Sequence, residues 1–223
     1  MSIKTNGTAG SQLTLLTPAT ALVATHTWMG WFKQTAGDIQ VPVSFDSGGG
    51  SLFEQFYTNG PVWFFFTDLG GGVDNSVGGS PSEFTFLAFA RVGDASTGTI
   101  DVYTGNGGAL TATNFSVHSS SQGTDMTHFG VGSTSSFAFD GIGVGIRYWN
   151  GVALTADEIG IEYRRLSPLV QLGSLYQYLP CLNNASPGTD MSGSGHNATV
   201  VNTFTTNRTM PPIPYGTPSL LAK

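Results

Sequence analysis

The sequence predicts an all-β fold, in which two antiparallel sheets form a jelly-roll sandwich with one short helix near 155–166 and extended terminal arms. Three observations predict this fold. Apolar and polar residues alternate along several short runs, turns rich in glycine and asparagine separate these runs, and one stretch carries helix signals. A chain of 223 residues fits one such domain, because sandwiches often reach this size as a single unit.

The alternating runs are the expected strands, and they cover residues 39–45, 83–91, 98–104 and 141–149. In the first run the odd-numbered residues are apolar, so we expect a half-buried strand, and Pro42 favours an edge or an outward N–H. The apolar faces expected in the other three runs are Phe84, Phe86, Ala88 and Ala90, then Ile100 and Val102, and last Ile142, Val144, Ile146 and Tyr148.

The run 61–67 ("PVWFFFT") is apolar on both of its faces. We favour a central strand that is covered on both sides. The alternative places Trp63 and Phe65 on a concave face, where a sugar ring could stack on them. These two residues are therefore the candidate glycan-binding site.

The stretch 153–165 ("ALTADEIGIEYRR") holds five charges in a chain that has few, and it is expected to form the helix. Thr155 and Glu158 make a capping box, in which each side chain satisfies a backbone donor of the other residue. Arg164 and Arg165 fall in the expected last turn, where the helix dipole favours positive charge. We therefore interpret these charges as structural.

The alternative for this stretch is a glycoside hydrolase that uses Glu158 and Glu162. Such enzymes need two carboxylates across the scissile bond, about 5–5.5 Å apart when they retain configuration. Laminarinase-type sandwich glucanases carry Glu-x-Asp-x-x-Glu on a strand, and "DEIGIE" lacks that spacing and is expected on a helix. We therefore predict that the protein is not an enzyme.

Metal-binding patterns are weak in this sequence. Residues 190–195 ("DMSGSG") imitate the opening of a calcium loop, but Val201 stands where the closing glutamate would be. We favour a loop in which Asp190 bonds its own downstream amides. The four histidines lack the spacing of zinc ligands. We predict no metal and no cofactor, because calcium lacks a full ligand set.

The composition narrows the partners and the location. Charged residues make up 10% of the chain, against about 25% in average domains, and the net charge is −6 with no basic cluster. Nucleic acid is therefore an unlikely partner by charge. The sequence contains no run of about 18 apolar residues, which is the length that a membrane-spanning helix needs. Residues 13–24 resemble strand material more than a signal peptide, so we expect synthesis in the cytoplasm without export by that route.

We expect three regions along the chain. Residues 1–12 form an N-terminal arm, residues 13–209 the jelly roll, and residues 210–223 a proline-rich C-terminal arm. Extended arms of this composition are ordered only when something holds them. We favour a neighbouring molecule, and packing on the arm's own domain is the alternative. The apolar residues of the second arm that we expect to bury against a neighbour are Ile213, Tyr215, Leu220 and Leu221.

Two segments carry a family resemblance. The stretch "FAFDGIGVGIRYWNGVALTADEIGIEY" resembles the closing segment of laminin-G-like, concanavalin A-like jelly rolls. The stretch "LYQYLPCLNNASPGTDMSGSGHNATVVN" resembles a segment that precedes the jelly roll in many members and here follows it. This order is similar to that of concanavalin A-like proteins encoded by bacteriophages and prophages. Gly143 and Val144 stand where the family carries acids, so an inherited calcium site is not expected.

The resemblance implies a non-enzymatic structural protein of a phage virion, such as a capsid decoration, head-fibre or tail-associated protein on the particle surface. Its expected partners are other virion proteins or copies of itself, with host-surface or environmental polysaccharide as a further partner. The alternative is a stand-alone, lectin-like carbohydrate-binding module, and a glucanase-type hydrolase is the third hypothesis.

Overall fold

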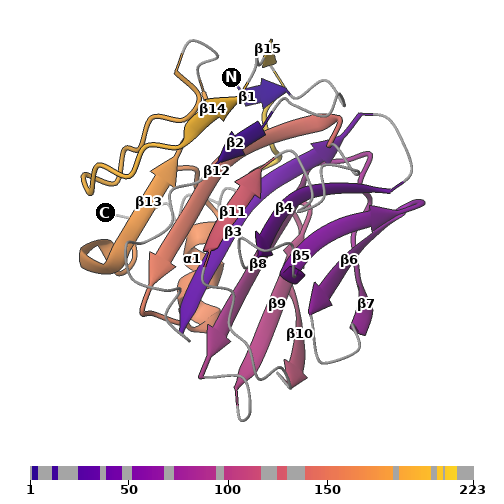
Figure 1. Ribbon diagram of the computed structural model, residues 1–223. Helices are drawn as coiled ribbons and strands as arrows, with labels where there is room; N and C mark the ends of the chain where they lie inside the picture. The colour runs from indigo at the N-terminus through magenta and orange to yellow at the C-terminus, as the bar shows by residue number, and fades with distance from the viewer. Residues whose placement is uncertain are drawn as a thin grey trace, which may run out of the picture.

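The structure is a computed structural model, and it describes residues 2–4, 12–14, 25–35, 39–46, 52–67, 73–93, 98–116, 125–129, 139–182, 186–201, 205–207 and 209–214 (Figure 1). Within these residues the chain forms two antiparallel sheets and one α-helix, so the all-β sandwich prediction is confirmed. The helix, α1 (Ala156–Tyr163), lies inside the predicted range.

The two sheets are built from strands far apart in the sequence. One sheet runs in the order β10 (Thr111–Ser116), β9 (Thr99–Gly105), β8 (Thr85–Val92), β3 (His26–Gln34), β12 (Gly141–Asn150), β1 (Ser2–Lys4) and β15 (Thr205–Asn207), with β13 (Leu175–Leu179) also paired to β12. The other runs in the order β14 (Thr199–Val201), β2 (Gln12–Thr14), β11 (Asp125–Phe129), β4 (Gln40–Asp46), β5 (Leu52–Asn59), β6 (Val62–Thr67) and β7 (Val73–Gly78).

Two apolar layers hold the sheets and the helix together. The first lies between the sheets and includes Trp28, Phe56 and Phe89. The second lies on the outer face of the β3–β8–β12 sheet, where Ile159 and Tyr163 of α1 cover it. Figure 1 shows α1 behind this sheet, on the side away from the β4–β5–β6 sheet. The β3–β8–β12 sheet is therefore buried on both faces, which a strand-alternation pattern alone does not reveal.

Strand β8 illustrates the double burial. Its expected face packs in the outer layer, with Phe86 and Ala88 among the residues that contact the helix side, while Leu87 and Phe89 point into the layer between the sheets. Ile100 and Val102 of β9 also lie between the sheets, as their alternation predicts. The period-two pattern thus assigned the faces of β8 and β9 correctly.

Strand β12 departs from the predicted alternation. Ile142 and Val144 pack in the outer layer, whereas Ile146 and Tyr148 pack between the sheets. The pairing with β3 shifts register between Val144 and Arg147, and Gly145 has a φ of 67°, a left-handed conformation that favours glycine. This bulge reverses the side-chain direction, so the prediction of one common face was wrong.

Strand β4 corrects a second expectation. It pairs with β5 on one side and β11 on the other, so Pro42 does not lie on an edge strand. The β4–β5 register shifts between Gln40 and Val43, and Pro42 sits in this irregularity, where a missing N–H costs no ladder bond. Gln40 and Ser44 are also buried, so the strand is not half-exposed as expected.

The chain ends pack on their own domain where the structure describes them. Ser2–Lys4, within the expected N-terminal arm, form β1 and pair with β12 and β15. In the C-terminal segment, Pro212 lies against Gly107, whose φ is 97°. The approach is close, because a Cβ added at Gly107 would lie 2.7 Å from the Pro212 carbonyl oxygen. Tyr215, Leu220 and Leu221 lie outside the described residues. The domain boundaries remain predictions.

None of the helical segments that the structure describes has the length and apolar character needed to cross a membrane.

Candidate functional site

The two predicted glycan-stacking residues are core residues. Trp63 and Phe65 are both 0% exposed and lie in the layer between the sheets. Phe65 packs against Phe56 with ring centroids 4.9 Å apart. Neither ring is accessible to a sugar, so the stacking prediction was wrong. The run is a central strand, as expected, but it is covered fully on this face alone, because Val62, Phe64 and Phe66 of the other face are only half-buried. Only the position of the second sheet decides this, because both faces of the run are apolar.

The capping box at α1 forms as predicted. The Glu158 amide donates to the Thr155 hydroxyl at 3.3 Å, and the Thr155 amide donates to the Glu158 carboxylate at 2.9 Å. The hydrogen bonds that Glu158 accepts from the Thr155 backbone and from the side-chain amide of Gln171 lower its pKa below the usual value. The helix ends at Tyr163, so Arg164 and Arg165 lie just beyond the last turn rather than inside it.

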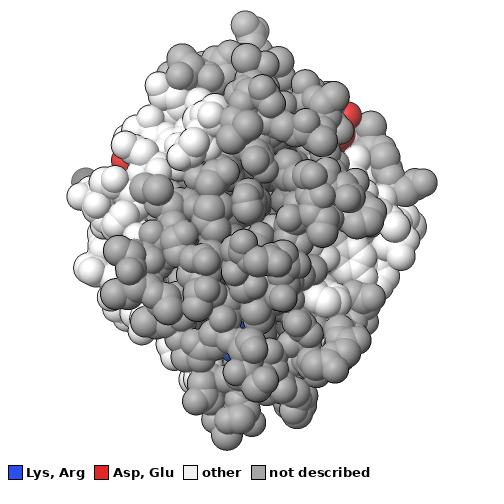
Figure 2. All heavy atoms as spheres, viewed as in Figure 1, with Lys and Arg blue, Asp and Glu red and all other residues white. Residues whose placement is uncertain are grey.

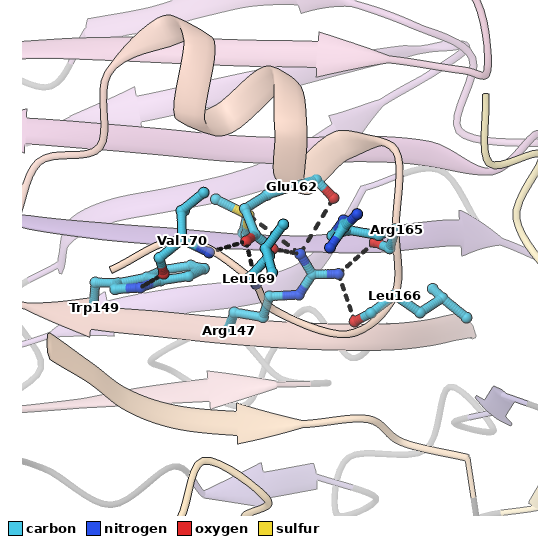
Figure 3. Close-up of polar contacts among 8 residues, drawn as sticks. Arg147, Trp149, Glu162, Arg165, Leu166, Leu169 and Val170 are labelled. Carbon is cyan, nitrogen blue, oxygen red and sulfur yellow. Dashed lines mark hydrogen bonds and ion pairs between the residues drawn. The ribbon is translucent and has the colours of Figure 1, made fainter. Parts of the chain in front are cut away.

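The second acid of this stretch, Glu162, is fully buried in an ion pair with Arg147 of β12 (Figure 3). Its other carboxylate oxygen accepts from the amides of Leu169 and Val170, at 2.6 and 2.8 Å. Figure 3 shows the carboxylate between the guanidinium and these two amides. Glu162 is therefore fixed from two sides and has no access to solvent.

Arg147 also satisfies the end of the helix. Its guanidinium donates to the carbonyl of Glu162 at 3.2 Å, and to those of Arg165 and Leu166 at 2.5 Å each. The last carbonyls of a helix have no intrahelical donor, and a buried cation compensates them. This cluster joins β12, α1 and residues 165–170 into one unit, and it offers no group to a substrate.

A second buried ion pair connects the two sheets. Glu54 of β5 is paired with Arg91 of β8, and its other oxygen lies 3.4 Å from Nε2 of His26 in β3. Burial raises the pKa of Glu54, but the hydrogen bond to His26 and the charge of Arg91 outweigh burial, and the net shift is downward. All three side chains are almost fully buried, which excludes them as an open acid–base site.

The Asp190 loop has the geometry predicted for it. One carboxylate oxygen accepts from the amides of Ser192 and Tyr178, at 2.9 and 2.8 Å, and the other accepts from the amide of His196 at 2.8 Å. These bonds and the Ser192 hydroxyl lower the pKa of Asp190, although burial alone would raise it. Within the described part of the chain, no group of three or more His, Cys, Asp or Glu is placed to hold a metal ion.

A cavity of about 260 Å³ lies at one end of the sandwich and is the candidate site. Three segments form it: the end of β3, the β5–β6 turn and the loop between β7 and β8 (Figure 1). Phe32 packs between the sheets, and Gln34, two residues further along β3, lies on the same face. The cavity is therefore at the end of the layer between the sheets. Its lining residues are Gln34, Thr35, Gly60, Pro61, Ser80, Pro81 and Ser82.

Hydrogen bonds hold the walls of this cavity in place. The Gln34 amide donates to the Pro81 carbonyl at 2.7 Å, which ties β3 to the β7–β8 loop. The Thr35 hydroxyl donates to Asp140 at 2.5 Å. The hydroxyl groups of Ser80 and Ser82 lie 2.9 Å apart, and one donates to the other. The site is thus preformed and lined by hydroxyl, amide and proline groups.

Sequence reasoning missed this cavity, because its residues are ordinary turn residues in three separate segments. The one sequence signal is the Gly-Pro pair at 60–61, which marks a tight hairpin turn. No lining residue carries a charge. Among the atoms that Figure 2 does not draw in grey, few belong to charged residues.

The comparisons support the fold and leave the family open. No family model and no curated protein matches the sequence. A protein from Bacteroides ovatus, provisionally assigned as carbohydrate binding, has a TM-score of 0.60 at 15% identity over 92% of this chain and 60% of that chain. The heptameric SAP-like pentraxin of Limulus polyphemus has a TM-score of 0.55 at 13% identity over 72% of this chain and 80% of that chain.

A third similar structure is the full-length tailspike protein 2 of the Escherichia coli bacteriophage CAB120. It has a TM-score of 0.54 at 15% identity, over 76% of this chain but 25% of that chain. At these identities the similarity concerns the fold alone. The chain has a two-sheet jelly-roll fold, as the resemblance in its sequence implies.

Proposed function

We propose that this chain is a non-enzymatic binding domain that recognises carbohydrate through the cavity at the end of its sandwich. The observation that carries the proposal is the neutral, hydroxyl- and amide-lined cavity, since pre-formed walls with a few polar groups are typical of small-ligand sites. The lectin-like fold shared with a pentraxin and a protein provisionally assigned as carbohydrate binding supports a binding role.

The state of the acidic side chains supports the non-enzymatic part. A glycoside hydrolase needs an accessible acid and a second carboxylate across the substrate. Among the described residues, Glu54 and Glu162 are buried in ion pairs, Glu158 caps a helix and Asp190 organises a loop. Each of these acids has a structural role that accounts for its position.

A second candidate function is a structural role in a phage particle. Two observations favour it: the order of the two family-like segments, and the similarity of the fold to part of a phage tailspike. The low charged fraction of the chain, 10%, also suits permanent contacts with other proteins or with copies of this chain. The two roles are compatible, because a virion protein can present a carbohydrate site.

The test uses the purified full chain on an array of neutral and acidic glycans, together with a reducing-end assay on the polysaccharides that it binds. We expect binding to at least one glycan and no release of reducing ends above a buffer control. An array without any signal would overturn the carbohydrate proposal, and turnover that disappears in Glu162→Gln or Glu158→Gln would overturn the non-enzymatic one. Mass spectrometry of purified particles from a host that encodes the chain tests the virion role.

A further inference from the structure

We propose that the end cavity takes a single neutral sugar ring, such as the terminal hexose of a chain, and discriminates against sialic and uronic acids. This inference rests on the proposed carbohydrate function and deepens it by naming the ligand class. It follows from the size of the cavity, the chemistry of its walls and the charges around it.

The size of the cavity limits the ligand to about one ring. Pockets for drug-sized molecules measure roughly 300–1,000 Å³. The end cavity, at about 260 Å³, lies below that range. It is closed on one side by Gln34, which is 8% exposed. A longer glycan would therefore place one terminal unit inside and extend into solvent.

The walls combine the two kinds of surface that a sugar ring presents. Pro61 and Pro81 supply rigid apolar surface for the C–H groups of the ring. Ser80 and Ser82 share one hydrogen bond between two hydroxyls, so the pair retains one O–H donor and free lone pairs for a ligand hydroxyl. Because the backbone around them is already hydrogen-bonded, little ordering is needed on binding.

Two acids stand next to the lining, whereas Lys33, which precedes Gln34, lies on the outer face of β3 with Trp31 and points away from the cavity side. Glu83 follows Ser82 directly and is exposed, and Asp140 is bonded to Thr35 at the rim. The lining itself contains no Lys, Arg or His that could pair with a carboxylate, and the whole chain has a net charge of −6. An anionic sugar would meet repulsion without a compensating cation, whereas a neutral sugar would not.

The decisive variant is Ser82→Trp, which fills the cavity from an exposed position. Its matched control is Thr99→Trp, because Thr99 is also exposed and the strand register places it at the opposite end of the sheet from Thr85 and Gln34. Thermal melts first establish that both variants fold like the parent chain. If Ser82→Trp does not fold, the double variant Ser80→Ala, Ser82→Ala replaces it, since both changes only remove hydroxyls.

Binding is measured by ligand-observed NMR with glucose, galactose, mannose, N-acetylneuraminic acid and glucuronic acid. We expect a neutral hexose to bind with a Kd of about a millimolar, as one ring allows, and the acidic sugars at least about tenfold more weakly. We expect Ser82→Trp to abolish the signal and Thr99→Trp to keep it. Preferred binding of an acidic sugar, or neutral binding that survives in Ser82→Trp, would overturn the inference and leave the carbohydrate function intact. Glycan binding on the array without binding of any of these monosaccharides would overturn the inference alone. The absence of binding in both experiments would overturn the inference and the carbohydrate function together.

Discussion

At the scale of single residues, the buried charged side chains that the structure describes act within the protein. The chain has 8 basic and 14 acidic residues, 22 in all. Among those that the structure describes, the buried ones occur in pairs, Glu54 with Arg91 and Glu162 with Arg147. A buried charge without a partner is costly, so each such residue depends on its counterpart. The capping residues of α1 act on a shorter range, because their partners lie three positions away.

Replacing the N-cap of α1 tests the short-range effect. Thr155→Ala removes the acceptor for the Glu158 amide and should cost about 1 kcal/mol in the free energy of unfolding. For a domain of this size the melting temperature should fall by roughly 2–4 °C. Thr155→Ser, which keeps the hydroxyl, is the control and should melt close to the parent. Equal stability of all three chains in a thermal melt would contradict the capping role.

Removing the buried cation tests the long-range effect. Arg147→Met leaves Glu162 buried without its partner and the carbonyls of Arg165 and Leu166 without a donor, so we expect a loss of about 3–5 kcal/mol. The double variant Arg147→Met, Glu162→Gln should lose less than the sum of the two single variants. Chemical denaturation of all four chains gives the coupling. Additive losses would show that the pair is energetically independent.

At the scale of elements, the structure depends on contacts between strands that are distant in the chain. Glu54 of β5 and its partners on β3 and β8 connect the two sheets at a buried point. Arg147 of β12 connects the outer face of one sheet to α1. The bulge at Gly145 makes the second contact possible, because it turns Arg147 and Trp149 toward the helix side. A regular strand would have pointed Arg147 into the layer between the sheets.

The inter-sheet pair predicts a dependence of stability on acid. The pKa of Glu54 is lower in the folded chain than its ordinary value of 4.5, so its contribution is fully present above that pH and is lost as the pH falls through the folded pKa. The stability gap between the parent and Glu54→Gln should therefore be largest near neutral pH and should narrow below about pH 4.5. Glu158 and Asp190 also have lowered pKa values, but both chains contain them, so their pH-dependent contributions cancel in the stability difference.

The measurement is a series of denaturation curves between pH 3 and pH 7, on the order of five values, for both chains and for Glu83→Gln, a change at an exposed glutamate. The Glu83→Gln chain should follow the parent at every pH. A gap between parent and Glu54→Gln that stays constant into acid would mean that the carboxylate does not stabilise the folded state through its charge.

At the scale of the whole molecule, the question is which parts serve the domain and which serve assembly. The C-terminal segment is divided by the structure: Pro211 is buried, and Pro212 lies against the β9–β10 turn at Gly107. Tyr163 of α1 reinforces this turn, since its hydroxyl accepts from the Gly107 amide at 2.6 Å and donates to the Gly108 carbonyl at 3.1 Å. Pro211 and Pro212 therefore pack on the sandwich.

Two truncations separate these roles. A chain that ends at Pro214 should keep the melting temperature of the parent, because the contacts of Pro211 and Pro212 are preserved. If Tyr215, Leu220 and Leu221 form the predicted assembly arm, this chain should also sediment as a smaller species or bind particles more weakly. A chain that ends at Thr209 should melt at a lower temperature. A chain ending at Pro214 that unfolds while the parent is monomeric would show that the remaining residues stabilise their own domain.

Local signals in the sequence were sufficient for several features. The sandwich follows from the alternation of the strands, the start of α1 from Thr155 and Glu158, and the Asp190 loop from its own downstream amides. In each case the residues that interact are close together in the chain or repeat with a simple period. Their geometry is therefore largely independent of the rest of the fold.

The remaining features were decided by the tertiary structure. Trp63 and Phe65 became core residues because a second sheet covers them, and Glu162 lost any catalytic access because Arg147 reaches it from β12. The end cavity exists only where β3, the β5–β6 turn and the β7–β8 loop meet. A strand that is apolar on both faces, or a turn made of serine and proline, has the same local sequence whether it is covered or open. The physical reason is that burial and cavities are properties of the packing between segments, which no single segment encodes.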